Sequence, residues 1–181
     1  MTLRAGLCFT VLLLQAAFVE AGQPKQTASG PLPTQIATAQ KVFIANGGED
    51  QPFSEDILFS GGSERAYDNF YAAMKTWGKY ELVGSPTDAD LLVEIELSSP
   101  RGGPAIATMS VAEAPPYDPQ FRATIRDAKT NALLWTVIEH VQWAILHGNR
   151  DKNFDLAMTR LVSDVQGLAA RAATTPTAAK Q

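Results

Sequence analysis

The segment Asp88–Leu97, DADLLVEIEL, carries the most regular pattern in the chain. From Leu91 onward, apolar residues recur at every second position. Side chains of a strand point alternately to its two faces, so this segment predicts a strand with one buried and one wet face. Phe121–Arg126, FRATIR, repeats the alternation and predicts a second such strand. Asp127–Asn131 predicts the turn that follows, because Asp and Asn side chains bond to nearby backbone groups.

A strand, a helix and another strand are predicted upstream of this pair. Val42–Ala45 is a short apolar run, which is typical of a buried strand. From Ala66, apolar residues recur in steps of three and four and predict a helix, with Ser63 as its N-cap and Gly78 as its C-cap. Tyr80–Val83 predicts the next strand. This order indicates a right-handed parallel crossover.

Downstream, Leu133–Ile145 predicts a long strand with a bulge at Glu139, and Asn153–Ala170 predicts a helix. We expect Trp77 and Trp135 to be buried, since each is in phase with the apolar residues of its element. The outline predicts an α+β fold. It is a two-layer sandwich, with a mixed sheet of about five strands and two helices packed on one face.

The composition predicts four parts: a signal peptide over 1–21, a flexible lead-in over 22–33, a single α+β domain over 34–170 and a disordered tail over 171–181. The signal peptide is indicated by a basic residue at Arg4, an apolar stretch over Ala5–Val19 and small Ala21 before the cleavage point. We therefore expect a periplasmic or secreted protein with no transmembrane segment after cleavage. The mature chain would have no cysteine, because Cys8 is the single one.

Charge and motif content exclude several functions. The net charge is −4 and no basic run occurs, so nucleic acid is not expected as a partner. His140 and His147 do not form a recognised zinc-binding spacing, and no nucleophile elbow is present. The sequence thus predicts no catalytic residue, no cofactor and no metal.

Two groups of polar residues remain as candidates for chemistry. Glu94 and Glu96 share one strand face and could act as a carboxylate pair, but cross-strand ion pairs with Arg122 and Arg126 are favoured. The second group, His147, Arg150 and Asp151, lies before the last predicted helix. In a structural interpretation Asp151 or Asn153 caps that helix and Phe154 anchors it to the sheet. In a functional one, these three residues face a ligand or partner.

Several segments resemble a family of uncharacterised secreted bacterial proteins. They are Ala66–Val83, Asp88–Ile95, Tyr117–Phe121, Asp127–Trp135 and Trp143–Asp155. The order of elements is also similar to small α/β envelope domains, such as the amino-terminal domain of the Tol translocation protein B and the curli-secretion lipoprotein. The resemblance implies an envelope binding or assembly role without catalytic residues. The chain departs from the lipoprotein relatives because it lacks a lipidated cysteine.

Two functional hypotheses follow. The leading one is a non-enzymatic extracytoplasmic binding or assembly module of the bacterial cell envelope, whose partner is an envelope protein or a glycan. The alternative is a secreted hydrolase that uses carboxylates or the loop with His147 and Asp151. An enzyme would be expected to show a concave pocket with convergent titratable groups.

We predict that residues 1–21 are removed during export, because the charged start, the apolar stretch and Ala21 agree. Mass spectrometry of protein from the native host should find a chain that begins at Gly22. A mature form that begins at Met1 would contradict the prediction.

Overall fold

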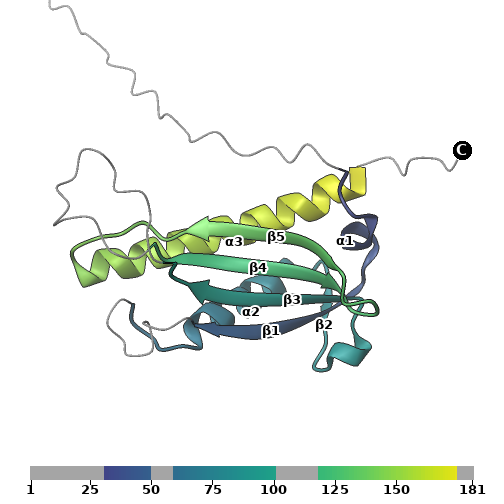
Figure 1. Cartoon of the computed structure of the whole chain (residues 1–181), viewed down its shortest axis with the longest axis horizontal. Helices are drawn as coiled ribbons and strands as arrows, with labels where there is room; N and C mark the ends of the chain where they lie inside the picture. The colour runs from purple at the N-terminus through teal and green to yellow at the C-terminus, as the bar shows by residue number, and fades with distance from the viewer. Residues whose placement is uncertain (1–30, 50–58, 101–117, 175–181) are drawn as a thin grey trace, which may run out of the picture. The chain divides into compact units, whose positions relative to one another are not determined.

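The computed structural model describes residues 31–49, 59–100 and 118–174. They form an α+β fold with a five-stranded mixed sheet, as the sequence predicted (Figure 1). The strands are β1 (Lys41–Glu49), β2 (Glu81–Leu82), β3 (Leu91–Ser98), β4 (Gln120–Asp127) and β5 (Leu133–His140). The helices are α1 (Thr34–Thr38), α2 (Arg65–Trp77), the 3-10 turn η1 (Pro86–Asp88) and α3 (His147–Thr174).

The strands lie in the order β2-β1-β3-β4-β5. β1 pairs in parallel with β2 and β3, whereas β3, β4 and β5 are antiparallel neighbours. Asp90 fixes the start of this arrangement, since its carboxylate accepts the N–H groups of Gln40 (2.9 Å) and Lys41 (3.0 Å). These backbone donors, the Lys41 N–H first, hold the pKa of Asp90 below its usual value. The acidic residue just before β3 therefore aligns β1 beside it.

The alternation of apolar and polar residues in β3 and β4 buries one face of each strand, as predicted. Leu91, Val93, Ile95, Phe121 and Ile125 are among the buried residues of the core. In Figure 1 α2 and α3 pass behind the sheet. Their buried residues join the same core: Phe70 and Met74 from α2, and Phe154, Ala157, Leu161, Val165 and Leu168 from α3.

Element ends differ from the sequence prediction in several places. β5 ends at His140 instead of Ile145, and the register shift lies between Ile125 and Arg126 instead of at Glu139. α3 begins at His147 instead of Asn153 and continues to Thr174, into the segment predicted as a tail. The chain also forms a third helix, α1, which was not predicted.

Both tryptophans predicted to be buried are only partly buried, although they pack against the core. Trp135 lies on β5, which among the described residues is an edge strand paired with β4. Trp77 meets Tyr80 edge-on, with ring centroids 5.3 Å apart. Tyr80 is the buried member of that pair, and its hydroxyl donates to the carbonyl oxygen of Ile36 on α1 (2.6 Å). Burial raises the pKa of Tyr80 to about 12.

Within the described ranges, no helix has both the length and the apolar composition that a membrane span requires. The predicted signal peptide lies outside these ranges, as do most of the predicted lead-in and the end of the predicted tail. Ala105–Val111, an apolar stretch whose sequence predicts a short strand, also lies outside them.

Phe70 should be essential for stability, because its side chain is fully buried between α2 and the sheet. We expect Phe70→Ala to lower the free energy of unfolding by about 3–5 kcal/mol. Urea denaturation measures it, with Leu156→Ala as the control, since Leu156 on α3 is 57% exposed. Equal losses for both variants would contradict the core described above.

Candidate functional site

The three site residues predicted from sequence lie on the first turns of α3. His147 and Asp151 are brought together, with Nδ1 of the histidine 3.3 Å from Oδ2 of the carboxylate. Arg150 points elsewhere, and its guanidinium carbon lies 5.4 Å from the ring centroid of Trp143. The three residues are therefore neighbours in the helix but do not converge on one point.

Asp151 is occupied by contacts within the fold. Its carboxylate accepts the N–H (2.9 Å) and the hydroxyl (2.7 Å) of Ser60 and one guanidinium N–H of Arg65 (2.7 Å). Burial by itself would raise the pKa of Asp151. The two Ser60 donors and the Arg65 charge outweigh it and hold this pKa well below its usual range. The carboxylate is thus ionised, and its role is to join α3 to the segment before α2.

Arg65 completes this junction. Besides Asp151, its guanidinium donates to the carbonyl oxygen of Ser60 (2.7 Å) and to Asp155 (2.8 Å). The same group lies 4.1 Å from the centroid of the Phe154 ring, which meets Phe121 of β4 edge-on at 4.8 Å. We call Ser60, Arg65, Asp151, Phe154 and Asp155 the α2–α3 junction. The prediction that Phe154 anchors the last helix to the sheet is confirmed.

The capping role predicted for Asp151 or Asn153 is wrong. α3 begins at His147, so both residues lie inside the helix. Asn153 donates from its side-chain amide to the carbonyl oxygen of Gln142 (2.8 Å) and holds the segment before α3. At the other predicted cap, Ser63, the structure places the N-cap one residue later, at Glu64, without a side-chain bond.

Ser60, His147 and Asp151 are the residue types of a serine-hydrolase triad, but they are connected in a different order. In a triad, histidine lies between serine and the carboxylate, so that it can take the serine proton. Here both Ser60 and His147 contact the Asp151 carboxylate. A strongly acidic carboxylate is also a poor general base. This arrangement does not support a hydrolase that uses His147 and Asp151. Nor do the described residues contain a cluster of three side chains suited to hold a metal ion.

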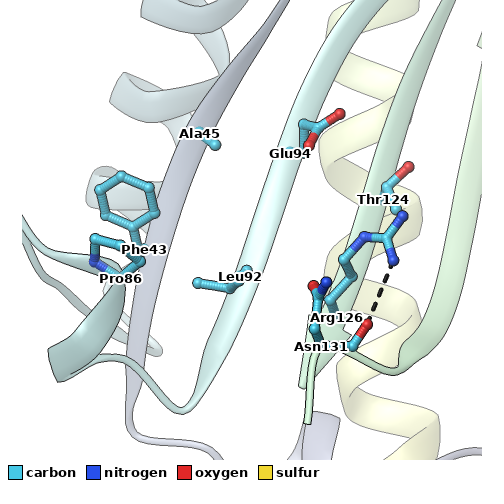
Figure 2. Close-up of a pocket in the computed structure, with 8 residues that line it drawn as sticks. All are labelled: Phe43, Ala45, Pro86, Leu92, Glu94, Thr124, Arg126 and Asn131. Atoms are coloured by element: carbon cyan, nitrogen blue, oxygen red, sulfur yellow. Dashed lines mark hydrogen bonds between the residues drawn. The ribbon is translucent and has the colours of Figure 1, made fainter. Parts of the chain in front are cut away.

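A cavity of about 350 Å³ lies on the sheet face opposite the helices (Figure 2). We call it the sheet-face pocket. Eight residues from β1, β3, β4, η1 and the β4–β5 turn form it: Phe43, Ala45, Pro86, Leu92, Glu94, Thr124, Arg126 and Asn131. Sequence reasoning placed Glu94 and Arg126 on this face but paired them differently. In the register Glu96 lies opposite Arg122, whereas Glu94 lies opposite Thr124 and Arg126 opposite Leu92.

A third feature is a set of exposed apolar side chains on β5 and on the segment after it. β5 is an edge strand, with Leu133 58% and Ile138 45% exposed. The segment after it exposes Trp143 (36%), Ile145 (88%) and Leu146 (66%). We call these five residues the β5 surface. Contiguous apolar patches on a protein surface mark interaction sites.

No protein-family model matches this chain, and no curated protein matches it. A PelC dodecamer from Paraburkholderia phytofirmans, in a variant form, is similar with a TM-score of 0.42 and 11% identity, over 82% of this chain and 98% of that one. The C-terminal domain of LpoB from Salmonella enterica is similar with a TM-score of 0.35 and 12% identity. That match covers 57% of this chain and 83% of the other.

A protein from Xanthomonas campestris, described by the family model DUF330, gives a TM-score of 0.42 and 13% identity. That match covers 74% of this chain and 85% of the other. At this level of likeness, the function of the chain has to be derived from its own residues. The resemblance to the Tol and curli domains stays a prediction.

The junction predicts a specific dependence on pH. The pKa of Asp151 in the folded state lies below the unfolded value of about 3.9. Its contribution is therefore complete above that pH and is lost as the pH falls toward the folded pKa. We expect Asp151→Asn to lower the free energy of unfolding by about 1.5–3 kcal/mol at neutral pH. The difference from the wild type should shrink below about pH 4.

Urea denaturation from neutral to acidic pH measures this difference. Asp155→Asn is the matched control, because Asp155 contacts the same arginine with a side chain that is 60% exposed. Asp155→Asn should lower the free energy of unfolding much less than Asp151→Asn, because exposed ion pairs contribute little to stability. Equal losses for the two variants, or a difference that does not depend on pH, would contradict the role given to Asp151.

Proposed function

We propose that this chain is a non-enzymatic binding or assembly module that acts outside the cytoplasm, in the bacterial cell envelope. Its partner is a protein that joins the β5 surface. The observation that carries the proposal is the contrast between the two edges of the sheet. The edge strand β2 covers only Glu81–Leu82, whereas the edge strand β5 covers Leu133–His140.

Long edge strands present unpaired backbone N–H and C=O groups to solvent. Proteins usually protect them with short length, proline, lysine or a covering segment. β5, LLWTVIEH, has no proline and no lysine, and among the described residues it pairs with β4 alone. An extended segment of a partner can add to such an edge, with backbone hydrogen bonds for affinity and side-chain contacts for specificity.

The apolar residues that follow β5 are held in place by the fold. The backbone N–H of Val141 donates to the carbonyl oxygen of Pro119 (2.7 Å), and Arg160 on α3 donates to that of His140 (3.2 Å). With the bond from Asn153 to Gln142, these contacts fix the chain on both sides of position 141. Trp143, Ile145 and Leu146 therefore extend from an ordered base, which lowers the entropy lost on binding.

The envelope location in this proposal is supported by the sequence: the signal-like residues 1–21 and the resemblance to secreted bacterial proteins. A protein-binding role is supported by the exposed apolar residues and by the contacts of Asp151 with Ser60 and Arg65, which commit this carboxylate to the fold.

A photo-cross-linking residue at Ile145 tests the proposal in the native host. We expect a cross-linked protein at Ile145 and none of the same mass at Leu156, which is exposed on α3. Ile138→Lys should remove the product, because lysine on an edge strand blocks the addition of another strand. The melting temperature of this variant should match that of the wild type, since Ile138 is 45% exposed.

Two outcomes would overturn the proposal. One is the same set of products at Ile145 and Leu156, which would indicate random collisions. The other is a product at Ile145 that persists at full yield in the Ile138→Lys variant.

A further inference from the structure

The sheet-face pocket is a grid of side chains from three adjacent strands. In one row Phe43, Leu92 and Arg126 are neighbours across β1, β3 and β4. In the next row Ala45, Glu94 and Thr124 are neighbours across the same strands. Adjacent strands lie about 4.8 Å apart, and rows on one face are about 6.6 Å apart. Leu92 is therefore next to both charged residues, with Glu94 one row along β3 and Arg126 opposite it on β4, and these two lie diagonally to each other (Figure 2).

One side of the pocket is apolar. Phe43 and Ala45 come from β1, and Pro86 from η1 lies beside Phe43. Together with Leu92 they present aromatic and aliphatic surface that remains partly exposed. This surface favours a ligand with an apolar body, because contact with it removes both from water.

The other side holds one negative and one positive charge. The Glu94 carboxylate has no hydrogen-bond or ion-pair partner among the described residues. Arg126 makes one long bond, of 3.4 Å, from its guanidinium to the carbonyl oxygen of Asn131. Its remaining N–H groups are available, since a guanidinium carries five donors. The two charges cancel, so the pocket fits a ligand that carries both signs.

The wall beside Arg126 is held rigidly. The Asp127 carboxylate accepts the N–H groups of Lys129 (3.0 Å) and Thr130 (2.8 Å) and the Thr130 hydroxyl (2.9 Å). These donors, the Thr130 N–H first, hold the pKa of Asp127 below its usual value. Asn131 follows with a φ of 56°, in the left-handed region that asparagine tolerates. The turn therefore presents Asn131 to the pocket in a fixed position.

We infer that the sheet-face pocket binds a short zwitterionic peptide with apolar side chains. Arg126, with Thr124 and Asn131 beside it, binds the carboxylate of the peptide, and Glu94 binds its ammonium group. The apolar side chains lie on Leu92, Phe43 and Pro86. A volume of about 350 Å³ is at the small end of ligand sites, which suits a dipeptide. This site lies apart from the β5 surface and does not depend on a protein partner.

Isothermal titration calorimetry of the full chain with leucyl-leucine tests the inference. We expect a Kd of about 1 mM or lower. N-acetyl-leucyl-leucine lacks the ammonium group and leucyl-leucine amide lacks the carboxylate, so each should bind about tenfold more weakly. Equal binding of all three probes, or no heat with leucyl-leucine at several times that concentration, would overturn the inference.

Variants assign each charge to its residue. Glu94→Gln should weaken the binding of leucyl-leucine about tenfold, so that it binds no better than the acetylated probe. Arg126→Gln should also weaken it about tenfold, so that it binds no better than leucyl-leucine amide. Glu96→Gln and Arg122→Gln are the matched controls, because these residues oppose each other on the same strands outside the pocket. Control variants that weaken binding as much as Glu94→Gln and Arg126→Gln would overturn the assignment. Failure of this test leaves the protein-binding proposal intact, since that proposal uses other residues.

Discussion

The Arg65 guanidinium ties the start of α2 to the first turns of α3, where both helices pack on the sheet. Its N–H groups reach Ser60, Asp151 and Asp155, while its planar face lies over Phe154. Such an arrangement satisfies a partly buried cation with charged and neutral acceptors and with an aromatic face. Because Phe154 meets Phe121 of β4, the polar tie and the apolar core act at the same place.

This constraint decides which polar groups are free to bind something else. Asp151 is the carboxylate expected in a catalytic or ligand-binding site here, but its oxygens accept hydrogen bonds from Ser60 and Arg65. The pocket on the far side of the sheet shows the opposite situation. There Glu94 has no partner among the described residues. The charges of Arg65 and Asp151 therefore join the helices, whereas those of Glu94 and Arg126 remain available on the open face of the sheet.

Local periodicity predicted the fold well and the contacts poorly. Alternation in Leu91–Leu97 identified β3 and its buried face correctly, because it depends only on neighbouring residues. Arg65 and Asp151 are 86 residues apart, and no local pattern shows that they meet. The start of α3 was missed because Gly148 and Asn149 are weak helix formers, so a capping role was given to residues inside the helix. The sheet-face pocket needs the register of three strands, which sequence alone does not supply.

The sheet is covered unequally, and that inequality explains why binding is assigned to two places. Helices bury one face, and the edge at β2 is too short to accept much of a partner strand. The edge at β5 and the open face of the sheet remain exposed, and each can bind a different kind of ligand. The edge offers backbone groups and apolar side chains, so its partner must be an extended chain. The open face offers a balanced pair of charges around Leu92, so its ligand must be small and carry both signs. β4 belongs to both, because it pairs with β5 and carries Thr124 and Arg126.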